Sequence, residues 1–207
     1  MYSKELGINF FGNESNKKTK LKKIDILKNN INNFKIFLVI AGTNTSQIPG
    51  ISAAGLNAKS RRITALADAE FLLMGASKDH KYKLPPLNAG VTPALISHVC
   101  SKLLNVYPVI VPLGIEVKPH FNHLIVEDRD LGPSNCLSTG KSMPRDRVVN
   151  LYKRGLEIGK SSKQPILISE SVPGGTTTAQ AVMEAFGLRV SNLVGSSLFK
   201  APRELRR

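Results

Sequence analysis

Short apolar runs alternate along the chain with segments whose apolar residues recur every three or four positions. Three runs, residues 34–41, 106–111 and 166–168, are rich in aliphatic and β-branched residues, a composition typical of buried parallel strands. Pro108 removes a backbone donor from the second run and favours an edge or irregular position for it. The alternation predicts an α/β fold built on a parallel sheet.

Helical spacing marks the segments between these runs. Residues 21–31 carry Leu and Ile at helical spacing on a polar background, and residues 145–160 form a second such segment with its apolar residues largely toward the core. A further helix is expected to begin near Ser60. Residues 72–74 (LLM) fit either the end of that helix or a short buried strand, because periodicity cannot separate the two over three residues.

Thr92 and Pro93 predict another helix start, since a capping hydroxyl is followed by proline at the first helical position. Cys100 is expected in the core on this helix as a small apolar residue. His98 lies beside the apolar stripe and is interpreted as a packing or surface residue rather than a catalytic base. The stripe itself consists of Leu95, Ile96, Val99 and Leu103.

The stretch 165–187 (PILISESVPGGTTTAQAVMEAFG) carries the most chemistry, because it predicts a strand, a tight turn and a helix in that order. Gly174 and Gly175 allow a ligand to approach the backbone, and the threonines at 176–178 offer an N-cap and hydroxyl donors. Glu170 ends the strand and is expected to face the same crevice. The turn is therefore either an anion site at a helix N-terminus or a bare connection.

A second candidate loop follows the first predicted strand. Residues 42–46 (GTNTS) lie at the carboxyl end of that strand, where ligands of open parallel sheets usually bind. Thr43 and Asn44 are small polar residues that let a ligand approach closely. The alternative is a solvated loop made of turn-forming residues.

The long irregular stretch 112–146 holds two motif-like features that we discount. His120, His123, Glu127, Asp128 and Asp130 are potential metal ligands, but their spacing does not match a compact zinc signature. Gly140-Lys141-Ser142 resembles the end of a phosphate-binding P-loop, yet the required first glycine is Asn135 and no apolar strand precedes it. We therefore predict neither a metal nor a cofactor.

Charge is concentrated toward the two ends of the chain. The formal net charge is +14, and residues 1–40 carry eight lysines against three acids. Without interleaved aromatic residues this charge favours a solvated surface over a nucleic-acid site. Two cysteines and no signal-peptide pattern suggest a cytoplasmic protein, and no apolar run is long enough for a membrane span.

Two regions follow from these patterns. Residues 1–33 form a basic N-terminal helical segment, and residues 34–207 form an α/β domain. Beyond Gly187 the pattern predicts the start of another strand and connection, which stops early. A doubly wound sheet ordinarily continues with a complete further strand and helix. We therefore expect a partial domain, incomplete at its C-terminus.

Four segments together resemble one enzyme family. They are AGTNTSQIPGISAAG, NAGVTPALISHVC, STGKSMPRDRVVNLYKRGLEIG and ISESVPGGTTTAQAVMEAFG. The chain resembles the nicotinate-nucleotide–dimethylbenzimidazole phosphoribosyltransferases from about Phe34 to Leu198, and is nearest their cyanobacterial and archaeal branch. The most specific shared element is the loop SVPGGTTTA.

The resemblance implies a Rossmann-like parallel sheet with helices on both faces, usually in a homodimer. It implies transfer of phosphoribosyl from nicotinate mononucleotide to a benzimidazole-type base in cobalamin lower-ligand synthesis. Glu170 would act on the ribose or the transition state, and Thr43 and Asn44 would lie on the base side. The residues matching the phosphate site are Ser171, Gly174, Gly175, Thr176, Thr177 and Thr178.

The resemblance also places the family's general-base carboxylate beyond residue 207, so we expect weak or no turnover from this chain. The turn around Asn44 lacks an Asp-His pair common in the better-known enzymes, which leaves the acceptor base open. Two other hypotheses compete with a transferase. One is a non-catalytic nucleotide-binding module, and the other is a basic nucleic-acid-binding protein.

Overall fold

The computed structural model describes residues 17–84, 92–127, 131–191 and 193–195. Several predicted features therefore lie outside the described residues. These are the first half of the basic N-terminal segment, the acids Asp128 and Asp130, and the last residues of the chain.

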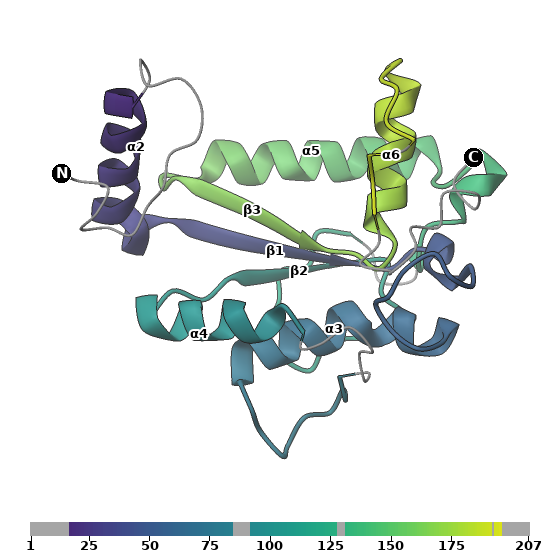
Figure 1. The fold of residues 1–207 in the computed structure, drawn as a ribbon, viewed down its shortest axis with the longest axis horizontal. Helices are drawn as coiled ribbons and strands as arrows, with labels where there is room; N and C mark the ends of the chain where they lie inside the picture. The colour runs from purple at the N-terminus through teal and green to yellow at the C-terminus, as the bar shows by residue number, and fades with distance from the viewer. Residues whose placement is uncertain (1–16, 85–91, 128–130, 192, 196–207) are drawn as a thin grey trace.

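Three parallel strands form the centre of the protein (Figure 1). They are β1 (Lys35–Ala41), β2 (Val109–Leu113) and β3 (Ile166–Ser171), in the order β2-β1-β3. The predicted α/β fold with a parallel sheet is confirmed. Among the described strands β2 is an outer one, in keeping with the predicted edge or irregular position, although Ile110 also forms a single bridge with His123. Because all three strands run in the same direction, their carboxyl ends meet at one edge of the sheet.

Strand β2 begins three residues later than predicted. Asn105 adopts the left-handed conformation with φ 51°, and the N–H of Val106 donates to the carbonyl of Ser101 at 3.0 Å. The N–H of Asn105 donates to the carbonyl of Lys102, so these residues end the preceding helix in a Schellman motif. This local helix cap uses Val106, which the sequence pattern had assigned to the strand.

Five α-helices and three short 3-10 turns are described around the sheet. Figure 1 shows α3 and α4 together on one side of the strands and α5 on the other. The LLM segment is the end of α3, which settles the ambiguity over residues 72–74. The bounds are α2 Lys17–Asn30, η2 Ile31–Asn33, η3 Asn44–Gln47, α3 Ala58–Met74, α4 Ala94–Leu104, η5 Leu137–Thr139, α5 Arg145–Ser161 and α6 Gly175–Ala185.

The main core lies between β1 and α3. Leu38 and Ile40 on one face of β1 join Ile110 of β2 against Leu66 and Leu72 of α3, and all five are buried. Phe37 is also buried although it points to the opposite face of the sheet. Strand β1 is therefore covered on both faces, as a central parallel strand requires.

Burial away from this core is lower than the sequence pattern predicts. Strand β3 was expected to be buried, yet Ile168 is 72% exposed because β3 forms an edge of the described sheet. Within α5 only Arg147 is buried, and Cys100 on α4 is exposed rather than in the core. An amphipathic pattern shows that a face is apolar, but it does not show that the described chain covers that face.

Asp68 of α3 ties this helix to the start of α4, and it gives the fold a pH dependence. The hydroxyl of Thr92 donates to Asp68 Oδ1 at 2.6 Å. Burial raises the pKa of the Asp68 carboxyl above its ordinary value of 3.8, and the hydrogen bond from Thr92 offsets only part of that shift. A carboxyl whose pKa is raised by folding stabilises the folded state at low pH and loses that contribution as pH rises.

We therefore expect Asp68→Asn to become progressively more stabilising, relative to the unsubstituted chain, as pH rises from 3.8 through the raised pKa. The amide oxygen still accepts from Thr92, so the substitution removes the cost of burying charge and keeps the hydrogen bond. Urea unfolding across this pH range measures the difference. Asp79→Asn, on an exposed side chain, is the matched control, and an equal pH trend in both variants would contradict the assignment to Asp68.

Candidate functional site

A pocket of about 390 Å³ lies where the three strands end. Ala41 of β1, Leu113 of β2 and Glu170 of β3 reach it from the sheet, while Leu151 of α5 and Thr178 of α6 complete its wall. Apolar side chains add to this wall as well: Met143, Val172 and Ala179. The pocket therefore offers an apolar surface with a few polar groups, the usual character of a small-molecule site.

Two glycines allow the strand ends to approach closely at the pocket. A Cβ on Gly42 would lie 2.5 Å from the carbonyl oxygen of Gly114, which is too close for any side chain. Gly114 has φ +55°, and a Cβ there would lie 2.6 Å from the carbonyl oxygen of Gly132. Both positions consequently need glycine, and the open end of the pocket depends on this close packing.

A buried ion pair holds the wall formed by α5. Arg147 donates to both carboxylate oxygens of Glu127, at 2.8 Å to Oε2 and 2.6 Å to Oε1. Glu127 also accepts the backbone N–H of Gly114 at 2.9 Å. The pair thus connects α5, the loop after β2 and the pocket rim, and Arg147 itself lines the pocket.

Glu170 lies beside the N-terminal end of α6. Its carboxylate is so near Gly175 that a Cβ on that residue would lie 3.5 Å from Oε1. A negative charge is favourable at this position because the helix dipole is positive there. The carboxylate therefore occupies part of the region that the sequence pattern assigned to a phosphate.

The structure places only part of the predicted phosphate set on the pocket. Gly175 and Thr178 line it, whereas Ser171, Gly174, Thr176 and Thr177 do not. Gly174 is buried, and its α-carbon faces Ser46 of η3.

The predicted threonine N-cap is wrong. Gly174 caps α6 in the left-handed conformation with φ 77°, no side chain forms a cap hydrogen bond, and the threonines lie within the first helical turn. The N–H groups of Gly175 and Thr177 donate to the carbonyls of Val172 and Gly174 at 2.8 and 3.0 Å. These two backbone donors close the turn and are not directed at the pocket.

The loop after β1 also divides between the pocket and the protein interior. Thr43 lines the pocket. Asn44 does not, because its side-chain oxygen accepts from Arg62 and its N–H donates to the carbonyl of Ser134 at 2.8 Å. Arg61 is buried and donates to carbonyls of the same loop, including that of Gln47 at 3.2 Å. The loop is thus fixed by two arginines of α3 that the sequence pattern did not single out.

The discounted metal candidates lie apart among the described residues. His120 Nε2 is 3.1 Å from Glu70 Oε1, and Glu127 is paired with Arg147. Within the part of the chain that the structure describes, no group of three or more His, Cys, Asp or Glu residues is arranged to hold a metal ion. Sequence reasoning assigned no site role to Arg147, Gly114 or Ser134, although all three line the pocket. Arg147 falls within one of the four segments that resemble the enzyme family, but that segment predicted only a helix.

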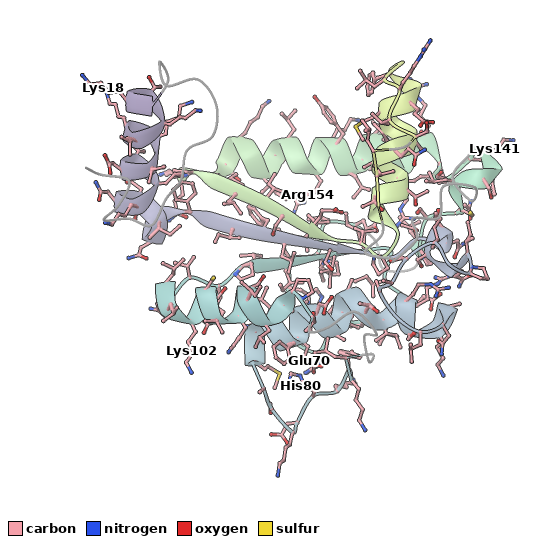
Figure 2. All side chains as sticks on the ribbon, viewed as in Figure 1. Lys18, Glu70, His80, Lys102, Lys141 and Arg154 are labelled. Atoms are coloured by element: carbon pink, nitrogen blue, oxygen red, sulfur yellow. The ribbon has the colours of Figure 1, made fainter. Side chains whose placement is uncertain are left out.

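The positions of the lysines and the lengths of the helices are relevant to nucleic-acid binding and to membrane spanning. Figure 2 shows Lys18 on α2, Lys102 on α4 and Lys141 near η5 at widely separated positions, pointing away from the chain. These three labelled lysines do not gather into one basic face. Among the described residues no helix has both the length and the apolar character to span a bilayer.

Comparison with known proteins relates the chain to a family. No family model matches the sequence. The UPF0284 protein of Prochlorococcus marinus strain MIT 9215 is 86% identical over 207 residues, which is all of this chain and 54% of that protein. The chain is a close relative of the UPF0284 proteins.

More distant UPF0284 proteins match most of the chain as well. The protein from Parasynechococcus marenigrum strain WH8102 is 48% identical over 174 residues, covering 84% of this chain and 44% of that protein. The protein from Gloeothece citriformis strain PCC 7424 is 40% identical over 168 residues, covering 78% and 45%. The chain therefore spans about half the length of the curated UPF0284 proteins it matches, and their names state no activity.

Proposed function

We propose that the pocket at the strand ends binds a nucleotide, and that the chain is part of a phosphoribosyltransferase. The proposal extends to a Rossmann-like sheet, to nicotinate mononucleotide as phosphoribosyl donor, to a benzimidazole-type acceptor in cobalamin lower-ligand synthesis, and to a homodimer. One observation carries it. Glu170, Thr178 and the start of α6 share a single pocket at the carboxyl ends of parallel strands.

The pocket wall supports distinct roles for its polar groups. Glu170 accepts hydrogen bonds from ribose hydroxyls, because its carboxylate lies at the strand end and faces the pocket. The hydroxyls of Thr43, Ser134 and Thr178 are donors on the wall that suit an anionic group. The Arg147 guanidinium also lines the pocket, but it is already paired with Glu127. The flat aromatic ring of the nucleotide packs against apolar side chains, of which Leu113 and Leu151 are the largest aliphatic ones.

The proposed chemistry is displacement of nicotinate from the anomeric carbon by a ring nitrogen of the acceptor base. The bond to nicotinate breaks as the bond to the acceptor forms, and positive charge develops on the ribose ring. A carboxylate placed as Glu170 is stabilises that charge electrostatically. A separate base must take the proton of the acceptor nitrogen, and we assign no residue of this chain to that task.

The 207-residue chain alone is therefore expected to bind the nucleotide without efficient turnover. This result is also what the alternative of a non-catalytic nucleotide-binding module requires. An assay of phosphoribosyl transfer to dimethylbenzimidazole by a full-length UPF0284 protein distinguishes the two hypotheses. Turnover favours the transferase, and its absence favours the non-catalytic module. Turnover of the 207-residue chain at an ordinary enzymatic rate would contradict our expectation for the shorter chain.

Calorimetric titration with nicotinate mononucleotide tests the binding site. We expect Glu170→Gln to weaken binding by roughly tenfold or more, because a hydrogen bond to a charged group contributes about 1.5–3 kcal/mol. Glu157→Gln, an equivalent change on the exposed surface of α5, should leave the affinity unchanged. If the chain binds neither the nucleotide, nicotinate nor inorganic phosphate, the proposed function fails.

A second titration, with an oligonucleotide as the ligand and at several salt concentrations, tests the nucleic-acid hypothesis. Binding through surface lysines, such as those concentrated on α2, would weaken steeply with salt and would not depend on Glu170. Binding in the pocket should respond to Glu170→Gln and much less to salt. Oligonucleotide binding that weakens steeply with salt and is unchanged by Glu170→Gln would favour the nucleic-acid hypothesis instead.

A further inference from the structure

Strand β3 carries apolar side chains that no described part of the chain covers. Ile168 is 72% exposed and Leu167 is also exposed, although they point to opposite faces of the sheet. Strands of parallel sheets are ordinarily buried on both faces. Within the described residues the sheet ends at β3, so its outer backbone edge pairs with no other strand.

Neighbouring helices extend this apolar surface. Residues of α5, β3 and α6 line one pocket, so the three elements adjoin one another. Each also exposes large apolar side chains, and we call the following set, in which Leu167 and Ile168 lie on opposite faces of the sheet, the β3 surface: Leu167, Ile168, Tyr152, Leu156, Val182 and Phe186. An apolar surface beside an unpaired strand edge favours association with further polypeptide.

The UPF0284 relatives indicate what that polypeptide is. All 207 residues have counterparts in the Prochlorococcus marinus strain MIT 9215 protein, and they make up 54% of it. We propose that the β3 surface is the docking surface for the part of the full-length UPF0284 protein that these residues do not span. One strand of that part pairs with β3, and further elements cover its two faces.

A second copy of this chain fits the surface less well. A two-fold axis beside β3 would pair the strand antiparallel with its own copy. The three described strands are all parallel, and purely parallel sheets are covered by helices on both faces. Covering Leu167 and Ile168 together therefore calls for polypeptide that supplies both a strand and flanking elements.

A full-length chimaera tests the proposal. In it, these 207 residues replace the matched region of the strain MIT 9215 protein, and Ile168→Asp is compared with Ile96→Asp. The control is closely matched, because Ile96 on α4 is 70% exposed. Each substitution is also made in the 207-residue chain, and thermal unfolding and hydrogen exchange are measured for every protein.

In the chimaera we expect Ile168→Asp to lower the Tm by roughly 5 °C or more beyond the effect of Ile96→Asp. In the 207-residue chain the two substitutions should agree within roughly 3 °C. Amides of β3 should exchange about tenfold or more slowly in the chimaera than in the shorter chain. Equal effects of Ile168→Asp in both proteins would overturn the proposal. So would a dimer of the shorter chain, seen by light scattering, that Ile168→Asp dissociates.

Discussion

An Arg147→Met substitution is expected to lower the free energy of unfolding by about 3–5 kcal/mol, because it leaves Glu127 as an unpaired buried carboxylate. The side chains of the two residues are only 8% and 9% exposed, and they share two short hydrogen bonds. Among the described residues, the N–H of Gly114 would remain as the hydrogen-bond donor to Glu127. Urea denaturation of the purified chain measures the loss.

Two controls make this prediction specific. Arg154→Met changes the same residue type on the same helix, but Arg154 is 48% exposed and forms a surface ion pair with Glu157, so the cost should be about 0.5 kcal/mol or less. The double substitution Arg147→Met with Glu127→Gln removes the buried charge and keeps an acceptor for Gly114. It should recover most of the lost stability, and a double variant as unstable as Arg147→Met would show that burial of charge is not the cause.

Glu70→Ala is expected to destabilise the chain by a similar amount, about 3–5 kcal/mol. Glu70 of α3 is fully buried, and it accepts the backbone N–H groups of Lys81 and Tyr82 at 2.9 and 2.8 Å. It also contacts His80 Nδ1 at 3.4 Å and His120 Nε2 at 3.1 Å, and Figure 2 shows Glu70 and His80 together beside α3. Removing the carboxylate leaves buried donors without an acceptor.

The exposed Glu116 supplies the control for Glu70. Glu116 is 54% exposed and forms an ion pair with Arg62 at 2.5 Å. Glu116→Ala should therefore cost about 1 kcal/mol or less, which denaturation under the same conditions will show. Equal losses from Glu70→Ala and Glu116→Ala would mean that the loop contacts of Glu70 contribute little to the fold.

The parts of the fold that the sequence predicted depend on local pattern. The β1 run is eight residues long and bounded by polar residues, so no other element competes for it. The strand, turn and helix at 165–187 are likewise local, and their order placed Glu170 at a strand end that does reach the pocket. The loop at Thr43 reached the pocket for the same reason, because parallel strands end at one edge.

The rest of the site depends on contacts between distant segments. Glu127 lies in irregular chain and Arg147 in a helix, and their pairing follows from the path of the intervening loop, which hydrophobic periodicity does not record. The threonines at 176–178 were expected to cap α6, but the left-handed conformation of Gly174 starts the helix earlier. Burial of β3 failed as a prediction because an apolar composition does not show which elements pack on the two faces of a strand.

The central claim is that the pocket at the strand ends is a nucleotide site, and amide chemical-shift mapping with nicotinate mononucleotide tests it most directly. We predict that the largest shifts occur at Gly42, Gly114 and Thr178, which line the pocket from three separate segments. Resonances of α2 should not move. Shifts confined to α2 and α4, or no shifts at millimolar nucleotide, would contradict the account.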